Sequence, residues 1–129
     1  SGAARAHSSP LASRTPTPHY PHTQQRRFSR SRTFRVSIIA ARHQCIPVIL
    51  DGFSVCIAAA ILHSINKESI SHCIAGHVTT ERGHEALLEK ISLIPIHDMG
   101  IGIGDGSGAA FALNTMRLNC EALSTIIEK

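Results

Sequence analysis

The sequence lacks paired cysteines, since none of its four cysteines stands in a C-x-x-C motif. They lie singly in apolar surroundings, at Cys45, Cys56, Cys73 and Cys120. This pattern argues against a disulfide framework and is typical of buried thiols in a reducing compartment. We therefore expect a cytoplasmic protein, with organellar targeting by a basic amino-terminal segment as the alternative.

Long apolar runs are also missing. The most apolar stretch, residues 46–62, contains Pro47, Asp51 and Gly52 near its beginning. A helix that crosses a bilayer needs about 20 consecutive apolar residues, so this stretch is too interrupted to span one. No membrane partner is expected for the chain.

Acidic residues are absent from the first third of the chain. Residues 1–44 carry eight arginines, no lysine and no acid, whereas residues 45–129 carry nine acids and five bases. The net charge of +4 is therefore the sum of two unlike parts and does not by itself indicate nucleic-acid binding. The segment R-R-F-S-R-S-R at 26–32 could contact RNA or an acidic partner. A solvated basic tail is the simpler interpretation, and nucleic acid is not an expected partner.

The same uneven composition predicts the domain organisation. Residues 1–35 are rich in Arg, Ser and Pro, and they lack an apolar period that could offset the entropy cost of ordering. We predict a disordered tail over residues 1–44 and part of an α/β domain over residues 45–129. The acid-free composition also fits a transit peptide, although the prolines argue against the amphipathic helix that such a peptide forms.

Beyond residue 45 the pattern becomes an alternation of strands and helices. Strands are predicted at 46–50, which is followed by D-G, and at 71–77. Helices are predicted at 53–65 and at 85–91, the latter with Thr79 or Thr80 as a possible cap. A third helix is predicted after the glycine loop, with one face made of Ala112, Met116, Asn119, Leu123 and Ile127. This order predicts an α/β fold, a partial doubly wound parallel sheet with flanking helices. Two strands do not make a stable sheet, so further strands must be missing or come from a partner.

The stretch M-G-I-G-I-G-D-G-S-G-A-A-F-A-L at 99–113 is the most unusual in the chain. Residues 104–109 formally fit the dinucleotide pattern G-x-G-x-x-A, but no strand ending in an acid follows, and no G-K-S/T is present. A carboxylate in a phosphate cradle would also repel the phosphate. The alternating glycines would instead let the backbone approach a ligand while Asp105 projects into the site. A flexible turn with a capping acid is the alternative.

The histidines offer a second candidate site. His72, His77 and His84 lie near Cys73, but their spacings of five and seven residues match no compact zinc-ligand pattern. We expect hydrogen-bonded histidines at strand ends and loops, and no metal.

Several motifs occur together in a distinctive order. They are P-V-I-L-D-G-F (47–53), S-H-C-I-A-G-H-V-T-T-E-R-G-H (71–84), A-L-L-E-K (86–90) and G-D-G-S-G-A-A (104–110). This order resembles the carboxyl-terminal part of the nicotinate-nucleotide:dimethylbenzimidazole phosphoribosyltransferase family, over about residues 45–127. The resemblance implies a doubly wound α/β fold and a homodimer.

The resemblance also implies a reaction. A ring nitrogen of 5,6-dimethylbenzimidazole displaces nicotinate from C1′ of nicotinate mononucleotide with inversion, which gives α-ribazole phosphate in cobalamin lower-ligand synthesis. Such a reaction needs a base for the azole proton and an environment that tolerates positive charge developing on the ribose. No cofactor is implied.

The site residues follow from the same resemblance. The family's base is a glutamate in the loop G-E-G-T/S-G-A-A, and the matching position is Asp105, flanked by Gly104 and Gly106. Asp51 and Gly52 match the strand-end loop beside the nucleotide. The small hydroxyl residue near the nucleotide is matched by Thr79.

Two positions depart from the family pattern. Asp105 is one methylene shorter than the glutamate, and a displacement of about 1 Å at a catalytic group can cost about 100-fold in rate. Gly102 stands where the family commonly has an arginine. Nothing in residues 1–44 resembles the family's upstream phosphate-binding segment, so we expect little or no activity from this chain alone. The alternative is a noncatalytic nucleotide- or protein-binding remnant with a basic targeting tail.

Overall fold

The structure is a computed structural model that describes residues 22–102 and 104–127. Its helices and strands, in chain order, are α1 (His22–His43), β1 (Val48–Leu50), α2 (Phe53–Ile65), the short 3-10 helix η1 (Lys67–Ile70), β2 (Cys73–His77), α3 (His84–Lys90), β3 (Pro95–His97) and α4 (Ser107–Ile127). The predicted helix at 53–65 is found with the same bounds. The α/β class is confirmed.

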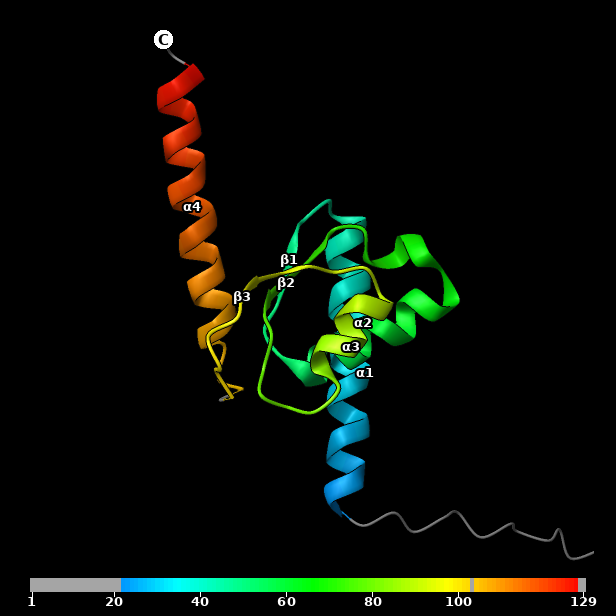
Figure 1. The fold of residues 1–129 in the computed structure, drawn as a ribbon. Helices are drawn as coiled ribbons and strands as arrows, with labels where there is room; N and C mark the ends of the chain where they lie inside the picture. The colour runs from blue at the N-terminus through cyan, green and yellow to red at the C-terminus, as the bar shows by residue number, and fades with distance from the viewer. Residues whose placement is uncertain (1–21, 103, 128–129) are drawn as a thin grey trace, which may run out of the picture.

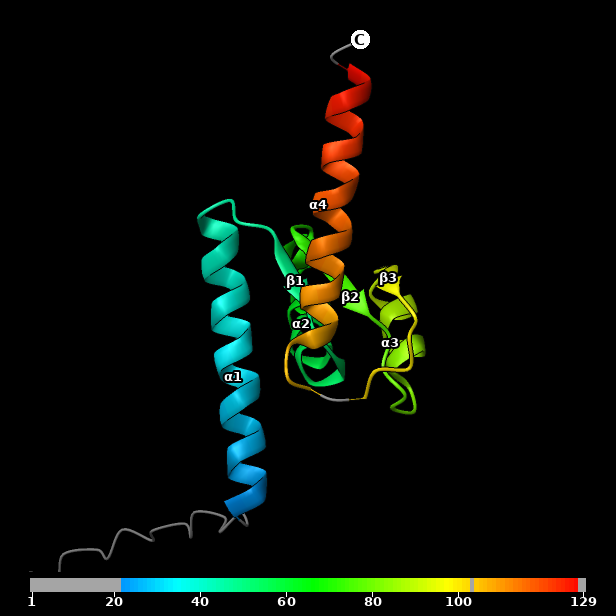
Figure 2. The ribbon, with the colours of Figure 1, turned by 90° about the vertical axis from the view of Figure 1, so that its left-hand side faces the viewer.

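The three strands form one parallel sheet in the order β1–β2–β3. Helices α1, α2 and α3 lie on one side of this sheet, and α4 crosses the other side (Figures 1 and 2). Helices on both faces of a parallel sheet are the arrangement of doubly wound folds. The predicted layering is therefore confirmed, and it brings the carboxyl ends of all three strands to one edge.

The main core lies between the sheet and helices α1 to α3. Helices α1, α2, η1 and α3 each contribute apolar side chains to it. The buried cluster comprises Ile38, Leu50, Cys56, Ala59, Leu62, Ile70, Cys73, Ala75, Leu88 and Ile91. On the other side, a side chain at Gly76 would press within 3.2 Å of the Cα atom of Ala109, so α4 approaches β2 closely there.

The predicted disorder over residues 1–44 is wrong for α1. Ile38, in the second half of this helix, is 2% exposed and belongs to the core. Arg42, near the end of α1, donates hydrogen bonds to the carbonyl oxygen of Glu68 and to Oγ of Ser71, at 2.6 Å from the latter. The helix is thus anchored to η1. The remainder of the predicted tail, residues 1–21, lies outside the described residues.

The apolar period in α1 is short and set among arginines. Phe34, Ile38 and Ala41 recur at helical spacing, and each is buried or half-buried. Because the arginine-rich segment at 26–32 lies within the same helix, composition alone hides this period. Arg30 and Arg32 of that segment are exposed.

The third strand was not expected from the sequence. Residues Pro95–His97 pair with β2, with Pro95 opposite Ala75 and His97 opposite His77. Because β3 has only three residues and begins with a proline, its sequence shows almost no alternation of apolar and polar residues. Proline is tolerated there because it stands at the first position of an edge strand. One of the strands thought to be missing is therefore supplied by the chain itself.

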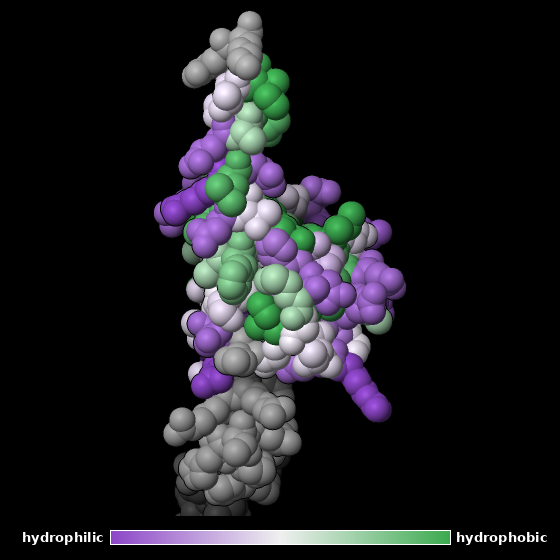
Figure 3. Space-filling model, turned by 60° about the vertical axis from the view of Figure 1, so that its left-hand side comes forward, coloured by the Kyte–Doolittle hydropathy of each residue, from purple (hydrophilic) through white to green (hydrophobic). Residues whose placement is uncertain are grey.

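Helix α4 extends well past the sheet that it crosses (Figure 2). Ala112 is fully buried and Met116 half-buried, whereas Leu123 and Ile127 are 57% and 80% exposed. Apolar surface accordingly follows the projecting part of the helix (Figure 3). Within the part of the chain that the structure describes, no helix combines the length and the apolar composition needed to cross a membrane.

The cysteines differ from the prediction of four buried thiols. Cys45 and Cys120 are exposed, and Cys56 and Cys73 are buried. Burial raises the pKa of Cys56 to about 12 and that of Cys73 to about 11. Because the thiolate is the reactive form, we expect Ellman's reagent to modify two thiols of the native protein quickly and the other two only in denaturant. Four thiols reacting at one rate would contradict this expectation.

Candidate active site

The candidate site lies at the carboxyl ends of the strands, where ligands of open α/β sheets bind. Asp51 and Gly52 follow β1, Thr79 follows β2, and the glycine loop runs from the end of β3 to α4. A side chain added at Gly52 would lie 3.5 Å from Cγ2 of Thr79, and one at Gly102 would lie 3.0 Å from Oγ1 of Thr80. The loops after β1 and β2, and the glycine loop, therefore meet at one edge.

Asp51 connects β1 to the beginning of α4. Its Oδ2 accepts a hydrogen bond from the backbone N–H of Gly106, and its Oδ1 accepts one from the backbone N–H of Ala109, each at 3.0 Å. A carboxylate at a helix amino terminus is favoured both by the unpaired N–H groups and by the helix dipole. Asp51 is therefore bound to the loop that carries the predicted base.

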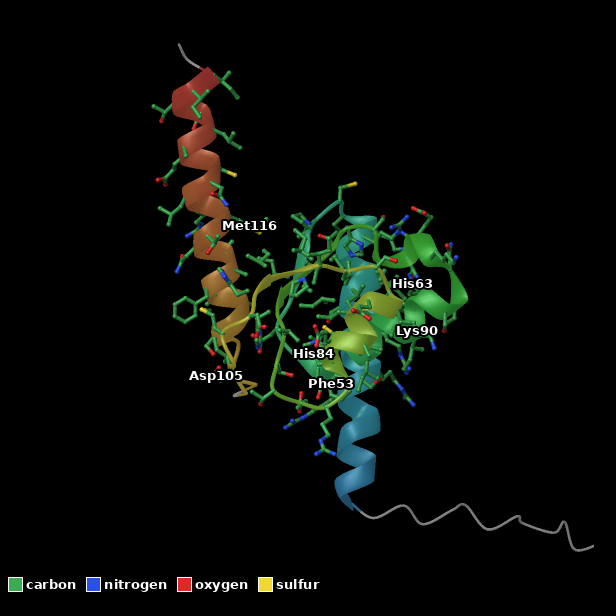
Figure 4. The ribbon with its side chains drawn as sticks, in the orientation of Figure 1. Phe53, His63, His84, Lys90, Asp105 and Met116 are labelled. Atoms are coloured by element: carbon green, nitrogen blue, oxygen red, sulfur yellow. The ribbon has the colours of Figure 1, made fainter. Side chains whose placement is uncertain are left out.

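Asp105 lies on the glycine loop just before α4 (Figure 4). Its side chain is exposed, and its Oδ1 accepts a hydrogen bond from the backbone N–H of Ser107 at 3.0 Å. Hydrogen bonds from the side chain and the backbone of Ser107 lower the pKa of Asp105. The group is therefore ionised at neutral pH and can accept a proton, although the same bonds make it a weaker base than a free carboxylate.

Thr79 is positioned by His84. The backbone N–H of Thr79 donates to Nδ1 of His84 at 2.9 Å, and the hydroxyl of Thr79 donates to Oε2 of Glu81 at 3.1 Å. The predicted helix cap at Thr79 or Thr80 is wrong, because the residue that precedes α3 is Gly83, with φ of 88°. The hydroxyl of Thr79 instead lies in the strand-end loop, 2.9 Å from Nδ1 of His84.

His84 is fully buried, and its ring packs against that of Phe53 with 5.5 Å between the centroids (Figure 4). Because Nδ1 accepts the Thr79 N–H, the neutral ring carries its proton on Nε2. Burial lowers the pKa of His84, and the nearby His77 lowers it further, against an opposing effect of Glu81. His84 is therefore neutral at physiological pH.

The pH dependence of stability follows from this pKa. The unfolded chain has a histidine pKa of about 6.5, above that of His84 in the fold, so below about pH 6.5 the unfolded state binds more protons. We expect the free energy of unfolding to fall as the pH drops through this range, and His84→Gln to weaken that dependence. The exposed His43 supplies the control His43→Gln, and urea unfolding at several pH values supplies the measurement. Identical profiles for wild type and His84→Gln would refute the assignment.

His72 and His97 have different hydrogen-bond partners. Nε2 of His72 lies 2.9 Å from the carbonyl oxygen of Ile38, and Nε2 of His97 lies 2.8 Å from Oγ1 of Thr115. These two and His84 fit the expected hydrogen-bonded histidines. His77 does not: it is 1% exposed, and within the described residues neither ring nitrogen has a hydrogen-bond partner. Its ring packs against Gly108 in the first turn of α4.

Two contacts join the predicted site residues, and they are linked because Asp51 and Gly52 are adjacent in the sequence. Asp51 bonds to Gly106, and the neighbouring Gly52 lies beside Thr79. Gly104 is exposed on the loop. The sequence did not predict that the ring of His77 packs against α4. Two signals were available: His77 ends an apolar strand, and Gly108 stands in the first turn of a helix.

Comparison with known proteins identifies the fold's relatives. A family model described as Phosphoribosyltransferase matches residues 36–128, which is most of the chain. The chain belongs to this phosphoribosyltransferase family. The match begins inside α1, so it includes the second half of that helix as well as the residues from 45 onward.

Named relatives agree with this membership. A nicotinate-nucleotide–dimethylbenzimidazole phosphoribosyltransferase from Methylocella silvestris is 48% identical over 81 residues, which is 63% of this chain and 24% of that protein. One of the same name from Brucella anthropi is 49% identical over the same shares. The crystal structure of CobT from Thermus thermophilus superimposes with a TM-score of 0.63 at 28% identity, over 68% of this chain and 26% of that one. The chain therefore spans about a quarter of the length of these relatives.

Proposed function

We propose that this chain carries the base-bearing part of a nicotinate-nucleotide:dimethylbenzimidazole phosphoribosyltransferase. The observation that carries the proposal is Asp105. The resemblance of its motif matches it to the family's glutamate base. In the structure it is exposed and ionised, and it lies on a loop that Asp51 binds to the end of β1.

The proposed reaction moves the ribose phosphate from one nitrogen to another. The bond from C1′ of nicotinate mononucleotide to nicotinate breaks with its electron pair leaving on nicotinate. The bond from C1′ to a ring nitrogen of 5,6-dimethylbenzimidazole forms on the opposite face. The proton lost from the azole passes to the carboxylate of Asp105, as general base catalysis requires. Backbone at Gly104 and Gly106 leaves space for the flat azole to approach this carboxylate.

The strand-end loops supply the proposed substrate contacts. Gly52 and the hydroxyl of Thr79 lie together at the ends of β1 and β2, where the ribose and its phosphate would bind. The residues that enclose both substrates in the family belong to the other three quarters of the fold. As the resemblance implies, we propose a homodimer in the complete fold, and a cytoplasmic location with organellar targeting by the basic segment as the alternative.

A noncatalytic role is the second candidate. It is favoured by the hydrogen bond that Asp105 accepts from Ser107, because this bond is what a purely capping acid would make. In that case the strand-end loops would bind a nucleotide or a protein without turnover, and the basic segment would serve docking or targeting.

Product analysis separates the two candidates. The 129-residue chain is incubated with nicotinate mononucleotide and 5,6-dimethylbenzimidazole, and α-ribazole phosphate and nicotinate are measured by chromatography and mass. The proposal predicts slow formation of both products in equal amounts, and faster formation by Asp105→Glu. A folded sample that forms neither product, in wild type and in Asp105→Glu, would contradict catalysis by this chain and favour the noncatalytic role.

A further inference from the structure

The amino terminus of α4 would normally be available to an anion, because the first N–H groups of a helix have no partner within it. In this chain the Asp51 carboxylate already occupies that position. Its two oxygens accept hydrogen bonds from Gly106 N–H and Ala109 N–H, each at 3.0 Å. A substrate phosphate placed there would meet a carboxylate and be repelled.

We infer that Asp51 is a positioning residue, which fixes the loop that carries Asp105, and is not a ligand of the nucleotide. This inference rests on the proposed function. It replaces the substrate-binding role expected for Asp51 from the resemblance, and it leaves Gly52 and Thr79 as the residues of this edge that are expected to contact the nucleotide.

The anchoring geometry explains how Asp51 can control a residue that it does not touch. Asp51 follows Leu50, which is fully buried in the middle of the fold. Its two hydrogen bonds join it to Gly106 and Ala109, which lie 55 and 58 residues further along the sequence. Asp105 directly precedes the first bonded residue, Gly106, and its own carboxylate is bonded to the N–H of Ser107. The position of Asp105 therefore depends on both ends of this connection.

The backbone of the loop gives little other restraint. Gly106 has φ of 90°, and side chains added at Gly104 or Gly106 would meet nothing within 4 Å. A loop of this kind can adopt many conformations unless a side chain holds it. The Asp51 carboxylate, directly after β1, bonds to the backbone N–H groups of Gly106 and Ala109 where this loop enters α4.

Hydrogen exchange measured by NMR on the 129-residue chain tests the anchoring directly. Asp51→Asn keeps the shape of the side chain but can accept at only one of its two terminal atoms, and Asp51→Ala removes both acceptors. We expect exchange at the amides of Gly106 and Ala109 to become about tenfold faster or more, as the loss of hydrogen bonds to a charged group implies. The amide of Leu62 in α2 reports global unfolding, so an increase at Gly106 and Ala109 that exceeds the increase at Leu62 measures the local loss of the anchor. Asp98→Asn, an exposed carboxylate at the end of β3, is the matched control and should leave all these rates unchanged.

Steady-state kinetics then separate positioning from nucleotide binding. If Asp51 positions Asp105, Asp51→Asn lowers kcat and leaves the KM for nicotinate mononucleotide nearly unchanged, whereas loss of a nucleotide ligand raises KM. Unchanged exchange at Gly106 and Ala109, or a raised KM with unchanged kcat, would overturn the inference. If the wild-type chain forms no product, catalysis by this chain alone fails, and the exchange rates alone decide whether Asp51 holds the loop.

Discussion

Gly108→Ala is expected to destabilise the fold more than any other single-methyl addition in the glycine loop. The added carbon would overlap the imidazole ring of His77, which is 1% exposed. Overpacking that forces side chains and backbone to shift costs about 1–3 kcal/mol, and occasionally more. This loss outweighs the gain of about 1 kcal/mol that alanine has over glycine within a helix.

Urea unfolding of Gly108→Ala measures this effect, and Gly104→Ala is its matched control. A side chain at Gly104 would meet nothing within 4 Å, so we expect that control to change the free energy of unfolding by less than about 0.5 kcal/mol. Equal stabilities of the two variants would show that α4 does not pack on His77.

Asp105→Asn is expected to give the largest loss of catalysis. The amide can still accept the hydrogen bond from Ser107 N–H, so the start of α4 is preserved, but it cannot take the azole proton. Removing a general base typically costs about 100-fold to 10,000-fold in rate. Asp105→Asn therefore separates the two roles of Asp105, because it keeps the helix cap and removes the base.

The measurement combines the rate of α-ribazole phosphate formation with the thermal unfolding midpoint. We expect Asp105→Asn to lose the rate and keep the midpoint within about 2 °C, since isosteric surface changes are usually near neutral. Ser107→Ala is the control for the cap, because it removes a side-chain hydrogen bond to Asp105 and leaves the carboxylate in place. Product formation by Asp105→Asn at the wild-type rate would remove Asp105 from the reaction.

Local signals predicted a large part of the fold. Helix α2 was found at its predicted bounds because an alanine-rich apolar run after D-G leaves little ambiguity. Strands β1 and β2 were recognisable as short branched runs. Helix α4 was predicted from its apolar spacing, although most of its projecting face is exposed.

The errors came from elements whose order depends on distant contacts. The second half of α1 is ordered by packing of Ile38 into the core and by the bonds of Arg42 to η1, and an arginine-rich sequence shows neither. Strand β3 is held by pairing with β2, and three residues cannot display a period. Tertiary context overrides composition in both cases.

The sequence predicted which residues belong to the site better than it predicted the contacts between them. Asp51 and Gly106 were both named from the resemblance, but the hydrogen bond between them spans 55 residues and follows only from the parallel sheet and the position of α4. The contact of His77 with Gly108 is of the same kind. Sequence motifs identify which residues take part, and the packing of α4 decides which of them touch.

A transplanted segment tests most directly whether this chain carries a working base. The matching 81 residues of the Brucella anthropi relative are replaced by those of this chain, and formation of α-ribazole phosphate from nicotinate mononucleotide and 5,6-dimethylbenzimidazole is measured. We predict that the chimera forms the product, that Asp105→Glu raises its rate, and that Asp105→Asn lowers it at least about 100-fold. A folded chimera whose rate is the same with Asp105 and with Asp105→Asn would contradict the account.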